Sequence, residues 1–150
     1  MAELKENPSA ADVVARLRGA MDAGFSLSHV VRLAGVSQYR ASVILNNTAQ
    51  GRVAGGEFNS KEIKAISDYL DSVKKRMSTT LEDDSWVDAL DVALEKGIKL
   101  SSVCRGCDIP VPLMCYRRSR SKNQDQLVNY FSSEEQSRLK SHLESVRDSI

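Results

Sequence analysis

A single glycine interrupts a helical pattern in the stretch SLSHVVRLAGVSQYRASVILNN, residues 26–47. Before Gly35, apolar residues recur at the three- and four-residue spacing of one helix face. After it, Ser37 can cap a second helix by accepting a backbone N–H from two or three residues later. Glycine also adopts, at low cost, the left-handed conformation that ends a helix. The stretch therefore predicts two helices joined by a tight turn at Gly35, the second running to about Asn47.

Helical patterns also flank this stretch. Apolar residues at helical spacing predict a helix over residues 10–23, ended by Gly24. A glycine-rich loop is expected after the second helix. Asn59 and Glu62 then form a capping-box pair, which predicts the start of a further helix whose apolar stripe extends to Met77. Because no stretch alternates as a strand would, we expect four helices here.

The chain resembles itself when it is shifted by 73 residues. Without any gap, 14 of the 61 positions from 13 to 73 meet an identical residue, where average composition gives roughly four. Unmatched positions keep their apolar character, as in the pairs Phe25 with Ile98 and Ile66 with Leu139. A repeat of this length indicates that one structural unit occurs twice.

The segment between the two copies is acidic and rich in serine and threonine. This segment, MSTTLEDDS at residues 77–85, is typical of a linker. We therefore predict an all-α protein of two tandem four-helix helix-turn-helix units, related by the 73-residue internal repeat. The first unit spans residues 9–77, and the second, more divergent unit spans residues 84–150.

Composition limits the classes of function. Hydrophobic residues make up 41% of the 150 residues and charged residues 27%, as in globular proteins. No apolar run approaches the roughly 18 residues that cross a bilayer, and the first residues do not resemble a signal peptide, so we expect a cytoplasmic protein without a membrane partner. The net charge is +1, with 11 basic and 8 acidic residues in 1–80 and 10 and 12 in 81–150. Any signal for a polyanionic partner must therefore be local.

Two short helices joined by a glycine-containing turn form the helix-turn-helix arrangement, whose second helix lies in the DNA major groove. The stretch LSHVVRLAGVSQYRASVIL resembles the phage-repressor type (lambda-repressor-like) of helix-turn-helix family, which has an A-G-V-S turn and two apolar positions in the second helix. The resemblance is carried by Val30, Val31, Ala34, Gly35, Val36, Ser37, Ala41 and Ile44. Val31 is a departure, because the family usually has alanine there and a bulkier residue would separate the two helices slightly.

The resemblance implies which residues face DNA. It places on that side of the second helix Ser37, Gln38, Tyr39, Ser42, Val43 and Asn46. Glutamine and asparagine can bond adenine bidentately, and Val43 can touch a thymine methyl group. Arg40 can reach a phosphate or a guanine, and Arg52, beside glycines, can approach the DNA backbone. The alternative for each polar residue is an ordinary solvent-facing helix surface.

The second unit is less regular. Asp108 takes the place of Gly35, and Pro112 disfavours a helical conformation at Val111. The corresponding helix is therefore expected to start near Pro112 and to be displaced or shorter. Its expected exposed face is basic: Arg117, Arg118, Arg120 and Lys122. This density favours phosphate contact, which supplies affinity but little sequence information, and a solvated basic face is the alternative.

The three cysteines suggest zinc at first, because two of them form a Cys-x-x-Cys pair. In the repeat, however, Cys104 and Cys107 fall on inward positions, where cysteine serves as a small hydrophobic residue, and only Cys115 is expected to be exposed. A fourth ligand is missing, so no metal is expected. We also find no nucleophile beside a base and no nucleotide-binding glycine loop, so we expect no enzyme, no catalytic residue, no cofactor and no small-molecule ligand.

These patterns favour a sequence-specific DNA-binding transcriptional regulator that places its units in successive major grooves of double-stranded DNA, as a single chain or as a homodimer. Repression is favoured over activation, because occluding a promoter requires only binding. By analogy, the motif suggests a phage, plasmid or bacterial regulator. The alternative is a protein-interaction module, an adaptor or inhibitor, whose second unit mediates dimerisation. Either use could employ side chains expected to be exposed: Tyr39, Val43, Met114 and Tyr116.

Overall fold

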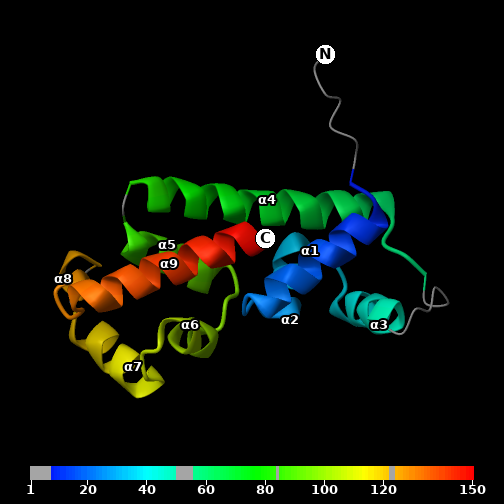
Figure 1. Ribbon diagram of the computed structural model, residues 1–150. Helices are drawn as coiled ribbons and strands as arrows, with labels where there is room; N and C mark the ends of the chain where they lie inside the picture. The colour runs from blue at the N-terminus through cyan, green and yellow to red at the C-terminus, as the bar shows by residue number, and fades with distance from the viewer. Residues whose placement is uncertain (1–7, 50–55, 84, 122–123) are drawn as a thin grey trace, which may run out of the picture.

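The computed structural model describes residues 8–49, 56–83, 85–121 and 124–150, and these residues form nine α-helices and no strand. This confirms the all-α class. Figure 1 shows α4 along one side of the molecule and α3 and α7 on the other, near its two ends. The helices are α1 (Ala10–Asp22), α2 (Leu27–Ala34), α3 (Gln38–Ala49), α4 (Ser60–Glu82), α5 (Trp86–Glu95), α6 (Leu100–Cys107), α7 (Val111–Arg120), α8 (Gln124–Val128) and α9 (Ser133–Ser149).

The turn predicted at Gly35 is confirmed. Gly35 ends α2 with a positive φ of 80°, and the N–H of Val36 donates to the carbonyl oxygen of Val31 at 2.8 Å. The side-chain oxygen of Ser37 accepts from the N–H of Arg40 at 3.3 Å, at the start of α3. These bonds satisfy backbone groups that a helix end leaves without partners, so the chain changes direction within a few residues.

α4 starts as predicted but does not end where the linker was expected. Asn59 and Glu62 exchange the two hydrogen bonds of a capping box. The linker prediction for 77–85 is wrong over most of its length, because α4 continues to Glu82 with Met77 and Leu81 in the core. The apolar residues, four positions apart, outweigh the hydroxyl-bearing residues between them and the acidic residues that follow Leu81.

The second half follows the same order of helices with one addition. α6 ends at Asp108, which has a φ of 57°, close to the left-handed conformation of Gly35. α7 begins at Val111, one residue before the expected start, with Pro112 in its first turn. Proline is accommodated there because first-turn N–H groups have no partner within the helix. α8 is a fifth helix, so the expected count of four is wrong for this half.

Helix starts recur at a fixed spacing. α2, α3 and α4 begin at residues 27, 38 and 60, and α6, α7 and α9 begin 73 residues later, at 100, 111 and 133. Equivalent packing contacts occur in both halves: α2 packs on α4 as α6 does on α9, and α1 packs on α4 as α5 does on α9. α4 also packs along α5 and α9, so one continuous core joins the halves.

The halves meet at a short antiparallel bridge between Phe25 and Ile98. The N–H of Ser26 donates to the carbonyl oxygen of Gly97, and the N–H of Lys99 donates to that of Gly24, both at 2.9 Å. Residues 24–26 and 97–99 are 73 positions apart. Each half therefore donates to the other a hydrogen bond equivalent to the one that it accepts. We call this pair of bonds the reciprocal bridge.

Candidate nucleic-acid interface

The outer face of α3 is polar, nearly uncharged and free of acidic residues. Ala41, Ile44 and Leu45 are buried and fix the orientation of the helix. The residues predicted to face DNA lie on its other sides. Ser37, Gln38, Tyr39 and Asn46 are exposed, with Tyr39 at 81%, while Ser42 and Val43 are partly buried. Four of the six side chains are therefore open to solvent, and the other two are partly covered.

Arg40 is held by the protein itself. Its Nε donates to the Glu62 carboxylate at 2.9 Å, and its second terminal nitrogen donates to the carbonyl oxygen of Glu57. Glu62 is the capping-box acid at the start of α4, so this ion pair ties α3 to α4. A base or phosphate would have to compete with these partners for the guanidinium group.

α7 presents a mixed surface. Arg118 and Arg120 are exposed, and the guanidinium carbon of Arg120 lies 5.3 Å from the Tyr116 ring centroid. The expectation that Met114 is exposed is wrong, because its side chain is fully buried. Met114 falls at the position of Ala41 in α3, one of the two inward apolar positions of the second helix. Arg52 and Lys122, two further basic residues of the predicted site, lie outside the described residues.

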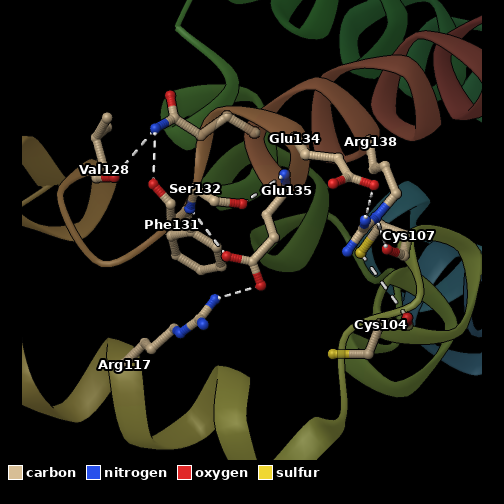
Figure 2. A network of polar contacts seen from close by, with 10 residues as sticks. Cys104, Cys107, Arg117, Val128, Phe131, Ser132, Glu134, Glu135 and Arg138 are labelled. Atoms are coloured by element: carbon tan, nitrogen blue, oxygen red, sulfur yellow. Dashed lines mark hydrogen bonds and ion pairs between the residues drawn. The ribbon is translucent and has the colours of Figure 1, made fainter.

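Arg117 is also a structural residue, as Figure 2 shows. Its guanidinium group donates to Glu135 at 2.9 Å and lies 4.7 Å above the Phe131 ring, with its side chain only 16% exposed. Backbone hydrogen bonding from Ser132, with a further contribution from Arg117, lowers the pKa of Glu135. Arg117 thus fastens α7 to the start of α9, and of the four basic residues predicted here only two are described as exposed.

Glu62 and Glu135 are equivalent residues that sequence reasoning did not pair with arginines. Both are capping-box acids, and they are 73 positions apart. Each carboxylate pairs with an arginine, Glu62 with Arg40 of α3 and Glu135 with Arg117 of α7. Arg40 is the third residue of its helix, whereas Arg117 is the seventh. The four-residue difference is about one helical turn. The repeat identified the two acids, whereas this change of donor could not be found without the structure.

The cysteines lie as the repeat predicted. Cys104 and Cys107 are buried, and Cys115 is exposed. The thiol of Cys107 donates to the carbonyl oxygen of Val103 at 3.0 Å, and burial raises its pKa to about 11. A thiol that stays protonated at neutral pH is a poor metal ligand. Across the residues that the structure describes, no group of three or more His, Cys, Asp or Glu could hold a metal ion.

The chain was compared with protein-family models, curated proteins and solved structures, and none of the three comparisons gives a match. In the described part of the chain, no helix has the length and apolar character required to span a membrane.

Proposed function

We propose that this protein is a DNA-binding transcriptional regulator built from two helix-turn-helix units in one chain. The observation that carries this proposal is the α2–Gly35–α3 arrangement, in which a tight left-handed turn sets α3 with its uncharged polar face outward. A helix of this kind can enter the major groove, because it carries no acidic side chain that DNA would repel. Gln38 and Asn46 supply the amide groups that recognise adenine.

A duplication of one unit is the second part of the proposal. The 73-residue spacing of three helix starts, the left-handed turns at Gly35 and Asp108 and the capping boxes of α4 and α9 support it. The reciprocal bridge supports a two-fold relation between the halves, since antiparallel bonds exchanged between equivalent residues are those of a rotation and not of a translation. α3 and α7 would then address two half-sites of opposite orientation, roughly one helical turn of DNA apart.

The two units would have different tasks. α3 would read bases through Ser37, Gln38, Tyr39, Ser42, Val43 and Asn46, while α7 would contact phosphates through Arg118 and Arg120. The basic residues predicted outside the described range, Arg52 and Lys122, would add phosphate contacts. Phosphate contacts give affinity that decreases with salt, and base contacts give sequence preference. A cytoplasmic protein of this kind would repress by occluding a promoter, as a single chain or as a homodimer.

A DNA titration at two salt concentrations tests this proposal. The wild type, Gln38→Ala and Arg118→Ala/Arg120→Ala would be compared on random duplex and on the region upstream of the protein's own gene. The matched control is Lys74→Ala/Lys75→Ala, which removes the same charge from α4 on the other side of the molecule.

We expect the wild type to prefer the upstream region, Gln38→Ala to lose about 1–3 kcal/mol of that preference, and the α7 variant to reduce the salt slope by about 2. The α4 variant should behave as the wild type. The proposal fails if no duplex is bound at low salt, or if the α4 and α7 variants lose affinity equally.

A protein-interaction module is the second candidate, because α7 also exposes large apolar side chains. Val111 and Leu113 are more than one third exposed, and Tyr116 is 54% exposed. In this alternative, α7 would join two chains. Sedimentation of the wild type and of Leu113→Ser/Tyr116→Ser distinguishes the two: a dimer that the variant dissociates, together with no affinity for DNA, would favour the interaction module.

A further inference from the structure

A cavity of about 330 Å³ lies where α1, α6 and α9 meet. It is lined by charged and hydroxyl-bearing residues, among them Asp22, Ser102, Arg105, His142, Ser145 and Ser149. Nothing in the proposed DNA interface uses this cavity. In the other half, the equivalent residues, 73 positions away, surround the end of α5 and not that of α1.

In that equivalent place, side chains fill the space at the C-terminal end of α5. Tyr69 donates its hydroxyl to the carbonyl oxygen of Lys96 at 2.7 Å. The Nε2 of His29 lies 3.1 Å from the carbonyl oxygen of Glu95, and the guanidinium group of Arg76 lies 3.7 Å from the Glu95 carboxylate. Three donor groups thus cover the negative end of this helix.

At the cavity, every one of these groups is replaced by a smaller one. His142 stands at the position of Tyr69, Ser102 at that of His29, and Ser149 at that of Arg76. The end of α1 consequently keeps its acceptors without these donors. Among the described residues, no side chain hydrogen-bonds or ion-pairs with Asp22, the equivalent of Glu95.

On the side of the cavity formed by the end of α1, the electrostatics favour a positive charge. α1 has no basic residue in its last turn, and a helix C-terminus carries partial negative charge that adds to the carboxylate of Asp22. Burial lowers the pKa of His142, so its imidazole is neutral at pH 7, and its buried Nε2 has no partner among the described residues. Arg105 is exposed at the rim, and its equivalent in the other half, Arg32, is exposed as well.

We infer that this cavity binds a small organic cation carrying a guanidinium or primary ammonium group. The cation would take the place that Arg76 occupies in the other half, with Asp22 as counter-ion. The carbonyl oxygens at the end of α1 and the hydroxyls of Ser145 and Ser149 would accept its N–H groups. This site does not depend on the proposed DNA binding.

The test uses ethylguanidinium as the probe and the uncharged, similarly shaped ethylurea as its control. Binding of each compound is measured through the backbone amide chemical shifts of the folded protein. We expect saturable shifts at the cavity residues, with a dissociation constant on the order of millimolar for so small a probe. Asp22→Asn should weaken binding about two- to fivefold, and Ser149→Arg, which restores the filling side chain of the other half, should abolish it. Glu95→Gln, the equivalent change in the other half, should leave binding unchanged.

Arg105→Ala separates a cation site from an anion site, because it should preserve or strengthen binding of ethylguanidinium. The inference is overturned if ethylurea binds as well as ethylguanidinium, if Ser149→Arg still binds the probe, or if Arg105→Ala abolishes binding. All four substituted side chains lie at exposed positions, and a circular dichroism spectrum of each variant verifies that it is folded.

Discussion

At the scale of single residues, the glycines that adopt a positive φ have different structural roles. Gly24 and Gly97 have φ values of 109° and 116°, which L side chains rarely adopt, and both belong to the reciprocal bridge. A Cβ on Gly24 would lie 2.5 Å from the Cβ of Ser102, and one on Gly97 would lie 2.8 Å from the His29 ring. At Gly35, by contrast, nothing lies within 4 Å of an added Cβ. Only the first two glycines serve both conformation and packing.

Gly24→Ala should therefore destabilise the protein more than Gly35→Ala. Backbone strain alone predicts a loss of about 1–2 kcal/mol for Gly35→Ala, and the added steric overlap raises the loss to about 2–4 kcal/mol for Gly24→Ala. Urea denaturation of the two variants and the wild type measures the difference. Equal losses would mean that the halves do not meet closely at this bridge.

At this scale, the burial of single residues could be predicted from the sequence, but the partners of the charged residues could not. The exposed polar face of α3 and the burial of Cys104 and Cys107 could be predicted, because helical periodicity determines which side of a helix is inward. The partners of Arg40 and Arg117 could not be predicted, because an exposed arginine and an ion-paired one look the same in a sequence. Arg40 lies on a partly exposed side of α3 and Arg117 takes the inward position of Ile44, and in both cases it is the approach of α4 or α9 that brings a carboxylate within reach.

At the scale of elements, α7 depends on an ion pair where α3 has an apolar contact. Ile44 of α3 is buried, and Arg117 stands at the equivalent position of α7, stacked on Phe131 and paired with Glu135. Hydrogen bonding from Ser132, aided by Arg117, lowers the pKa of Glu135 in the folded state. The folded state therefore binds this proton less readily than the unfolded chain, and the resulting stabilisation is present above the ordinary glutamate pKa of about 4.3 and lost below it.

Glu135→Gln should consequently lower the free energy of unfolding by about 1–2 kcal/mol at pH 7. Glutamine still accepts the capping-box hydrogen bond, so the loss reports the charge. The difference from the wild type should narrow as the pH falls below about 4. Denaturation curves at pH 7, 5 and 3 measure this difference. Glu134→Gln serves as the control and should have little effect on stability, because the Glu134 side chain is 82% exposed. A difference that stays constant with pH would contradict this account.

The elements also show why one boundary was missed. Capping residues and left-handed turns gave the starts of α3 and α4 and the end of α2 within about a residue, because these signals are local. The end of α4 had no such signal. Composition indicated a linker at 77–85, whereas Met77 and Leu81 continue the buried stripe for a further turn and a half. Tertiary contact with α5 made that extension stable, and contact of this kind is not local in the sequence.

At the scale of the whole molecule, the two halves share one core. α4 packs on α5 and α9 as well as on α1 and α2, and Arg16 of α1 donates to the carbonyl oxygen of Ile150 at 2.8 Å. Neither half therefore keeps all its buried contacts without the other. Sequence repeats suggested two separable units, but a repeat does not reveal how much surface its copies bury against each other.

Unfolding should accordingly be a single cooperative transition. Trp86, the only tryptophan of the chain, lies in the second half and contacts Phe131 edge-on at 5.1 Å between ring centroids, so its fluorescence reports that half. Circular dichroism reports the helices of both halves. The two signals should give the same midpoint in urea. Two transitions, with the fluorescence change confined to one of them, would show that the halves unfold independently.

The reciprocal bridge uses only main-chain atoms, and this makes the junction between the halves tolerant of divergence. Apart from Gly24 and Gly97, the residues that form it need not match: Phe25 faces Ile98, and Ser26 is equivalent to Lys99. A symmetric dimer of identical chains must accept every substitution twice, whereas here each substitution alters one half alone. The surface of α3 can therefore be redesigned while α7 stays as it is, without separating the two halves.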